Sequence, residues 1–249
     1  EVVANFKRVG GSTGIKGGLA EHNIVGQGKS GSLVYSRDGS AESKAFGYQD
    51  PQFLHYKRLR YSINAIVSPG NRNYSMELTR PFYASIARMS AGATLNYTEA
   101  PLGTYTRRIT EAGANYGLAV ATSTERTRHV KFGFLAHRAE STGPSQDLEQ
   151  LGFLQLGADW EELDFVTLRR IQRFTRDEDY NLGFGIFPAV AWAPPARLLG
   201  TTGSQVLPSV TVRKNLAWED NLVLFNTGYR SKYSNGGNSN RVASLDAAY

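Results

Sequence analysis

The sequence predicts an all-β fold, an antiparallel up-and-down transmembrane β-barrel, from three observations. Apolar residues alternate with polar ones along most of the chain, the alternating runs are long, and aromatic residues stand near their ends. Alternation alone also fits a soluble sandwich. The length of the runs favours a membrane protein, because they span roughly nine to thirteen residues whereas strands of soluble proteins centre on about five or six.

Along the chain, six runs show the alternation most clearly, and the polar positions between their apolar residues suit water or a polar lumen. The apolar positions are Leu59, Tyr61, Ile63, Ala65 and Val67; Met89, Ala91, Ala93, Leu95 and Tyr97; Tyr116, Leu118 and Val120; Val130, Phe132, Phe134 and Ala136; Leu154, Leu156, Ala158 and Trp160; and Tyr180, Leu182, Phe184 and Ile186. Counting all such runs predicts roughly twelve to fifteen strands and almost no helix.

The ends of the runs and the links between them add to the barrel prediction. Aromatic residues that fit girdles at two membrane interfaces are Phe53, Tyr56, Phe82, Tyr83, Tyr97, Tyr105, Trp160, Tyr229 and Tyr233. Longer polar links are expected at 36–44, 68–73, 98–113 and 138–150, and tighter ones at 25–29, 50–57, 80–85 and 122–127. Outer-membrane barrels show this asymmetry, which would place the turn at 25–29 on the periplasmic side.

Composition limits the function classes. The chain has 249 residues, no cysteine and a net charge of +6. Its basic residues are scattered, which argues against nucleic-acid binding. The absence of cysteine excludes disulfides and cysteine-based metal sites. No apolar run is long enough for a transmembrane helix, although a barrel strand is apolar only at alternate positions.

The stretch Gly28-Lys29-Ser30 ends like a phosphate-binding loop, but the rest of that motif is absent. Asn23 stands where the first glycine is required, and β-branched and aromatic residues follow in place of a helix. We therefore predict a tight turn in which Gly26 and Gly28 adopt positive φ.

We identify no catalytic, cofactor-binding or metal-binding residues, and we expect no enzyme. His129 and His137 share a strand face but lie about 26 Å apart, too far to hold one metal. The acidic residues Glu161, Glu162, Asp164, Asp177, Glu178 and Asp179 lack calcium-loop spacing, and Arg169, Arg170, Arg173 and Arg176 are expected to pair with them. Hydrolase and zinc-protease motifs are missing from the sequence.

Two turn motifs and their order resemble a known family. Glu21, Asn23, Gly26 and Gly28 fit a Glu/Asp-Asn-x-x-Gly-x-Gly turn with His22 inserted, and Asp50, Pro51 and Phe53 fit an Asp-Pro-x-Phe segment. With "YSMELTRPFY" at 74–83, they resemble the start of the barrel in the BamA and TamA relatives, the outer-membrane assembly and translocation family also called bacterial surface antigens. "RRIQRFTRDEDYNLGFGI" is similar to a segment of uncharacterised members. In that family the turn follows the second strand and the Asp-Pro segment follows the fourth.

The resemblance implies a barrel of about sixteen antiparallel strands in the outer membrane of a Gram-negative bacterium. Residues 1–249 would supply its N-terminal and central part, about twelve strands or more. Periplasmic domains would precede Glu1 and the final strands would follow Tyr249, together with the family's Arg-Gly-Phe or Arg-Gly-Tyr lumen loop, which does not occur here. The isolated chain is then expected to aggregate or oligomerise, because a partial barrel leaves unpaired edges.

The implied function is insertion, assembly or translocation of other proteins without ATP or a cofactor. The implied partners are outer-membrane lipid, unfolded outer-membrane or secreted client proteins, and periplasmic proteins bound through upstream domains. In this family the first and last strands meet at a weak seam that templates client strands. The corresponding residues here are Val2, Val3, Ala4, Asn5, Phe6, Lys7, Arg8 and Val9, which fit an ordinary strand or a linker equally well.

Three rival functions remain open at the level of sequence. The chain could form a secretion pore for one passenger, or a passive diffusion channel, which the polar face supports equally. A soluble all-β binding protein is the third, and it predicts stability in water without detergent.

Overall fold

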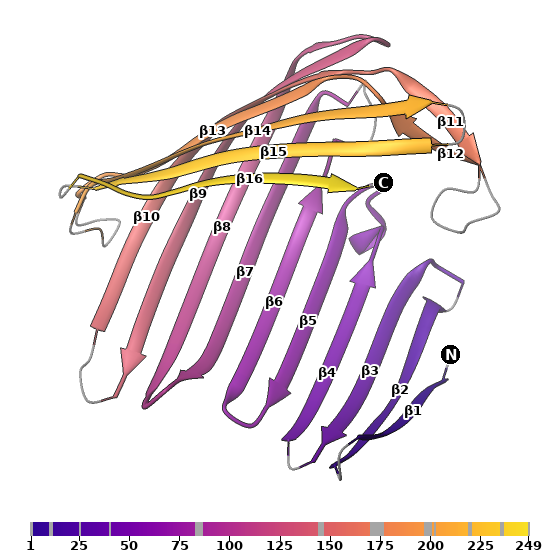
Figure 1. Cartoon of the computed structure of the whole chain (residues 1–249), viewed down its shortest axis with the longest axis vertical. Helices are drawn as coiled ribbons and strands as arrows, with labels where there is room; N and C mark the ends of the chain where they lie inside the picture. Colours follow the sequence, from indigo (N-terminus) through magenta and orange to yellow (C-terminus); the bar gives the residue numbers. More distant parts are fainter. Residues whose placement is uncertain are drawn as a thin grey trace. The chain divides into compact units, whose positions relative to one another are not determined.

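The computed structural model describes residues 2–9, 12–24, 26–39, 41–82, 87–143, 147–169, 177–196, 201, 203–218, 221–234 and 237–248. Fourteen strands form one antiparallel sheet in which sheet order follows chain order, and β11 and β12 form a separate two-stranded sheet (Figure 1). The fourteen are β1 Val2–Val9, β2 Ser12–Ile24, β3 Lys29–Asp38, β4 Ala41–Asp50, β5 Arg60–Ser68, β6 Asn71–Arg80, β7 Met89–Leu102, β8 Tyr105–Thr122, β9 Arg126–Thr142, β10 Asp147–Glu162, β13 Gly185–Ala193, β14 Gln205–Trp218, β15 Asn221–Ser234 and β16 Gly237–Ala248. The two-stranded sheet pairs β11 Phe165–Arg169 with β12 Asp177–Asn181.

These elements confirm the all-β, antiparallel, up-and-down prediction. Strands of the large sheet run from 8 residues in β1 to 18 in β8, well beyond the usual soluble strand. In the described part of the chain the helical structure is one 3₁₀ turn, η1 Phe53–His55. No helix there is long and apolar enough to cross a membrane.

The chain divides into two compact units. Unit 1 comprises Glu1–Pro81, Ala91–Ala114 and Leu135–Leu151, and unit 2 comprises Phe82–Ser90, Asn115–Phe134 and Gly152–Tyr249. Strands β1 to β6 lie wholly within unit 1, and β13 to β16 lie wholly within unit 2.

The predicted direction of the link asymmetry is wrong. Only two residues each separate β3 from β4, β5 from β6, and β7 from β8, because the polar stretches expected as long links continue the strands. Gly39, Gly70 and Gly103, with φ of +59°, +76° and +66°, allow these tight hairpins. The longer links follow β4 at 51–59, β6 at 81–88, β10 at 163–184 and β13 at 194–204. Link length therefore no longer places the turn at 25–29 on the periplasmic side.

The predicted run from Tyr180 to Ile186 is also wrong as a single strand. It contains the end of β12, a bend at Gly183 and the start of β13. The bend forms because Asn181 Oδ1 accepts a hydrogen bond from Gly183 N at 2.9 Å. A Cβ at Gly183 would lie 2.0 Å from the Glu162 carbonyl oxygen, so only glycine fits there.

Few hydrophobic side chains are buried in the described residues. The buried ones are Ala87, Ala139, Leu151, Phe153, Leu168, Ala193 and Leu222, and none of the large side chains there is fully buried. Many more large apolar residues are exposed on the strands, among them Leu33, Phe46, Leu95 and Trp192. A soluble domain of this length normally encloses such residues in a core.

Candidate functional site

One face of unit 1, called the apolar face below, carries apolar side chains that continue from strand to strand. Directly opposed residues form one row across β1 to β7: Val2, Leu19, Leu33, Phe46, Ala65, Tyr74 and Tyr97. A second row across β4 to β7 comprises Tyr48, Ile63, Met76 and Leu95. Opposed residues of an antiparallel sheet share one face. Leu33, Phe46 and Leu95 are 60%, 45% and 47% exposed, so these rows form a broad apolar surface.

The opposite face of the same strands is polar. Ser32, Gly47, Asn64, Ser75 and Asn96 oppose one another across β3 to β7, and Asn64 Nδ2 donates to Ser75 Oγ at 3.4 Å. The alternation predicted for β5 and β7 is therefore confirmed within unit 1. It separates a polar surface from the apolar face within single strands.

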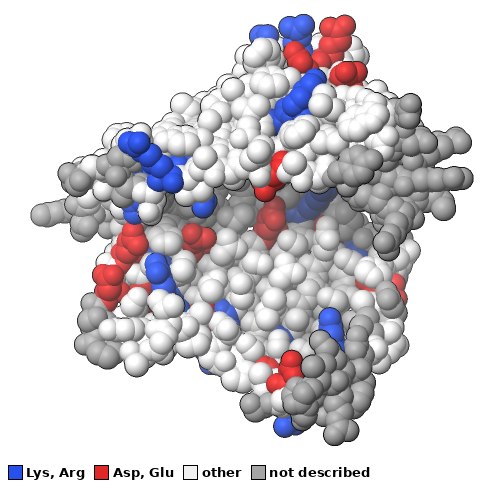
Figure 2. All heavy atoms as spheres, in the orientation of Figure 1, with Lys and Arg blue, Asp and Glu red and all other residues white. Residues whose placement is uncertain are grey.

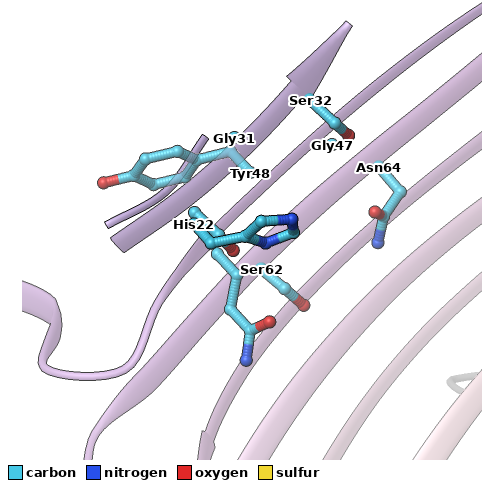
Figure 3. Close-up of a pocket in the computed structure, with 9 residues that line it drawn as sticks. His22, Gly31, Ser32, Gly47, Tyr48, Ser62 and Asn64 are labelled. Atoms are coloured by element: carbon cyan, nitrogen blue, oxygen red, sulfur yellow. The ribbon is translucent and has the colours of Figure 1, made fainter. Parts of the chain in front are cut away.

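A hollow of about 320 Å³ opens on this polar face between β2 and β5 (Figure 3). Figure 3 shows the side chains of Ser62 and Asn64 directed away from the ring of Tyr48, as alternation requires. A Cβ at Gly47 would lie 3.0 Å from Ser32 Oγ and 3.3 Å from Asn64 Oδ1, so glycine keeps the hollow open. Serine, glycine and amide groups dominate its lining, which suits water or an uncharged polar chain.

Aromatic residues cluster near both ends of the apolar face. At the β5–β6 hairpin end, the rings of Tyr74 and Tyr97 lie 5.9 Å apart. At the other end, Tyr61 lies 4.8 Å from the stacked ring of Phe53 and 6.4 Å from Tyr48. Phe53 and Tyr97 belong to the predicted girdles. Tyr61 lies within a predicted alternating run, whereas Tyr48 and Tyr74 were not singled out, because spacing along one strand does not show which neighbours a ring meets.

Charged residues border the tyrosines at the hairpin end. Glu99 Oε2 accepts a hydrogen bond from Tyr97 Oη at 2.6 Å and from Arg108 Nε at 3.1 Å. Tyr35 Oη likewise donates to Glu42 Oε1 at 3.1 Å. Figure 2 shows basic and acidic side chains interspersed on the face in view, in place of a single basic stripe.

The first turn motif forms a compact turn between β2 and β3. Asn23 Oδ1 accepts a hydrogen bond from Gly28 N at 2.7 Å, and Glu21 Oε1 accepts one from Asn23 N at 3.0 Å. Gly26 N donates to the Asn23 carbonyl at 3.0 Å. Gly26 and Gly28 have φ of +71° and +68°, which confirms the predicted positive φ at both glycines. Each motif residue thus has a conformational role, and the strand β3 follows the turn where a phosphate-binding loop would open a helix.

The second motif lies beside the first. A Cβ at Gly28 would be 3.7 Å from Pro51 Cγ, and Lys29 Nζ lies 3.4 Å from Asp50 Oδ2. Asp50 is 3% exposed, and its Oδ1 accepts a hydrogen bond from Gln52 N at 2.9 Å. The turn follows the second strand and Asp50 ends the fourth, so the structure brings the two motifs together at one end of β2 to β5.

Residues 2–9 form β1, the first strand in the order of the large sheet. Val2 to Val9 pair with Leu19 to Ser12 of β2. Among the described strands β2 is the only hydrogen-bonded neighbour of β1, and β15 the only one of β16. Each end strand therefore offers one row of backbone donors and acceptors without a strand partner in the described part of the chain.

Unit 2 also carries rows of opposed, mostly apolar residues on one face of its strands. One row of opposed residues comprises Trp160, Ile186, Val212, Thr227 and Leu245, and another comprises Leu154, Trp192, Val206 and Tyr233. Trp160, Trp192 and Leu245 are 42%, 46% and 73% exposed. The apolar surface is therefore present in both units.

A polar network that the sequence did not reveal anchors the β11–β12 hairpin to the large sheet. Asn181 Nδ2 donates to Glu161 Oε1 at 2.8 Å and to the Glu162 carbonyl at 2.9 Å, and Asn181 O accepts from Asn215 Nδ2 at 2.8 Å. Arg213 forms an ion pair with Glu161. Its guanidinium lies 5.4 Å from the centre of the Phe187 ring. Residues from four strands, β10, β12, β13 and β14, meet here, and no local sequence pattern indicates such a meeting.

The predicted ion pairing of the acidic residues is therefore resolved differently for Glu161. Among the described residues, strand pairing brings Arg213 of β14 and Asn181 of β12 to Glu161. Arg170, Arg173 and Arg176 lie outside the described residues, as do the side chains of Arg169, Asp177 and Glu178. Asp179 Oδ1 accepts a hydrogen bond from Thr167 Oγ1 at 2.6 Å.

The histidines of β9 have separate local partners. His137 Nδ1 lies 3.0 Å from Glu111 Oε1. His129 is 8% exposed, stacks on Phe82 with ring centres 3.9 Å apart, and lies 3.9 Å from Asp159 Oδ2. Lys131 pairs with the same Asp159 carboxylate at 2.5 Å. In the part of the chain that the structure describes, no group of three acidic or histidine side chains could hold a metal ion.

Comparison with known proteins finds likenesses among solved structures. No family model matches the sequence, and no curated protein matches it. Among solved structures, the fold is similar to that of BamA from Haemophilus ducreyi lacking POTRA domains 1–3, with a TM-score of 0.49 and 12% sequence identity. The match covers 95% of this chain and 47% of that one, so this chain spans about half the length of the solved structure.

Proposed function

We propose that this chain is part of a transmembrane β-barrel of the bacterial outer membrane that inserts, assembles or translocates other proteins. The location in a membrane is supported mainly by one observation: single long strands have an exposed apolar face and a polar face. Every backbone group of a membrane-spanning segment needs an internal partner, and long antiparallel strands in chain order supply one. The aromatic clusters at both ends of the apolar face match the girdles of such barrels.

The assembly role is supported by the turn motifs and by β1. The motifs resemble those of the BamA and TamA relatives, and they lie after the second and fourth strands. A client strand that enters the membrane needs backbone partners, because unpaired groups are costly in lipid. An end strand with one paired neighbour offers such partners. The role proposed is therefore strand templating, which involves neither catalysis nor a cofactor.

If the strands span a membrane, a charged substitution should destabilise the chain at one residue of β7 and have little effect at the residue next to it. Leu95 lies on the apolar face opposite Met76, and Thr94 lies on the polar face opposite Glu77. Leu95→Arg should destabilise the folded chain in lipid vesicles by about 2–4 kcal/mol, the cost of arginine near the middle of a bilayer. Thr94→Arg is the matched control and should change stability little. Urea titration of the folded fraction, followed by protease resistance, measures both.

The soluble alternative makes the reverse prediction. If the chain folds in water without lipid or detergent and Leu95→Arg folds as well as the parent chain, the membrane proposal is wrong. A solvated arginine on a soluble surface costs little.

The assembly role predicts that a client strand pairs with β1. The chain has no cysteine, so Ala4→Cys places a single thiol on this end strand. In cells expressing this variant, it should form disulfides with cysteines placed in the terminal strand of an outer-membrane protein during assembly. Ala65→Cys is the control. Ala65 lies on the same face of the sheet as Ala4, but its strand β5 has paired neighbours on both sides.

A passive channel or a secretion pore gives a different result. Equal and low crosslinking at positions 4 and 65 would contradict templating and favour a channel that uses the polar face. Crosslinks from Ala4→Cys to one passenger alone would favour a dedicated secretion pore.

A further inference from the structure

Five cations, called the rim cations below, lie at one end of the apolar face of unit 1: Arg37, Lys44, Arg72, Arg108 and Arg138. Register places the first three on that face, since Arg37 opposes Ile15, Lys44 opposes Tyr35, and Arg72 opposes Val67. Arg108 joins them through its contact with Glu99, which opposes Arg72. Alternation along β9 puts Arg138 and His137 on opposite faces of the strand. A guanidinium nitrogen of Arg138 lies 3.5 Å from Glu140 Oε2.

The rim cations differ in how far they are neutralised. Arg108 pairs with Glu99 and Arg138 with Glu140, and Arg37 Nε donates to the Gly39 carbonyl. Lys44 and Arg72 are exposed, and among the described residues neither has a carboxylate within salt-bridge distance. They lie two strands apart, with Val67 between them, at a spacing of about 10 Å.

Apolar residues lie directly next to these two cations along the strands. Phe46 follows Lys44 by two residues and Tyr74 follows Arg72 by two, and both belong to the long apolar row. Two residues of a strand span about 7 Å. An amphipathic molecule whose chains cover Phe46 and Tyr74 therefore has its polar end beside Lys44 and Arg72.

We propose that Lys44 and Arg72 bind the headgroup phosphate of an anionic membrane lipid whose acyl chains contact Phe46 and Tyr74. The site rests on the proposed membrane function, and it adds a preferred lipid class at a defined part of the surface. A guanidinium and an ammonium together match a phosphate, because arginine donates in a planar fork and lysine supplies a compact charge. Each basic residue near a membrane surface favours anionic lipid roughly fivefold.

A local tryptophan reporter tests the site. Tyr74→Trp, in the chain with Trp160, Trp192 and Trp218 changed to phenylalanine, places the one indole in the row beside Arg72. The chain is folded into vesicles that contain phosphatidylglycerol or phosphatidylcholine with brominated acyl chains, which quench tryptophan on contact. The ratio of quenching by the two lipids gives their relative binding at this position.

We expect the reporter to prefer brominated phosphatidylglycerol, and Lys44→Gln with Arg72→Gln to remove most of that preference, roughly fivefold for each charge. Lys16→Gln is the matched control, since Lys16 is exposed near the same end of the sheet and opposes Ser36 on the polar face. It should leave the preference unchanged. Arg72→Lys keeps the charge and should retain most of it, which separates loss of charge from loss of fold.

Two results overturn the lipid site and leave the membrane function standing. One is equal quenching by both brominated lipids. The other is a preference that inorganic phosphate abolishes, because the site would then bind a soluble anion. Absence of quenching by either lipid in a protease-resistant chain overturns both proposals, because the tyrosine row would not contact acyl chains.

Discussion

At the scale of single residues, the turn between β2 and β3 shows which details a sequence can predict. The sequence predicts positive φ at Gly26 and Gly28 because a tight turn, and not a phosphate-binding loop, fits the residues around them, and the structure confirms both values. The contact of Lys29 with Asp50 was not predictable, because 20 residues separate them and only strand register brings them together. Asn181 was missed for the same reason. Four hydrogen bonds join it to segments that are distant in sequence.

The turn predicts a difference between two glycine substitutions of equal size. Gly26→Ala should destabilise the folded chain by about 1–2 kcal/mol, because alanine is strained at a φ of +71°. Gly17→Ala is the control, since a Cβ there also meets no atom within 4 Å and the backbone is extended. It should be neutral or stabilise by up to about 1 kcal/mol. Urea midpoints in detergent micelles measure both variants. Equal destabilisation would show that β2 lacks room for a side chain and that strain at the turn matters little.

At the scale of elements, period two predicted strand existence and face well but strand ends poorly. The apolar residues from Tyr61 to Val67 and from Ala91 to Tyr97 lie on the predicted faces, because lipid or core contact fixes alternation wherever one face is apolar. The polar residues at 98–113 predict a long link, whereas the structure has a two-residue hairpin at Gly103. Polarity marks contact with water, and a strand that continues beyond the apolar rows meets that condition while keeping its backbone hydrogen bonds. Link length therefore cannot be read from composition in such a chain.

At the scale of the whole molecule, the sequence predicts the all-β fold class, but it predicts the function only in outline. Alternation, strand length and aromatic placement are properties of many residues, so local errors such as the run through Gly183 do not change the all-β prediction. Function depends on which strand edge meets a partner, and no residue of β1 distinguishes a templating strand from an ordinary one. The resemblance of the turn motifs supplied that step, and it remains a proposal for experiment.

The apolar face also predicts a preferred bilayer thickness. On β6, Arg72 and Arg80 bound the apolar stretch on one face, eight residues apart, which is about 27 Å along the strand. A strand tilt of 35–45° reduces this to roughly 20 Å along the membrane normal, less than the usual apolar band of about 25 Å. The bilayer beside β4 to β6 should therefore be thin, and thinning of this kind would lower the barrier to inserting a client strand beside the protein.

We therefore expect the chain to fold faster and in higher yield in vesicles of short-chain phosphatidylcholine than in vesicles of long-chain phosphatidylcholine. Arg72→Leu extends the apolar stretch by about 7 Å along the strand and should shift the best yield toward thicker bilayers. Asn73→Leu is the control, because Asn73 opposes Ile66 on the polar face and does not lengthen the stretch. Protease-resistant yield across a series of acyl-chain lengths measures the optimum. An optimum in thick bilayers, or a shift as large with Asn73→Leu, would show that the two arginines do not bound the segment in contact with lipid.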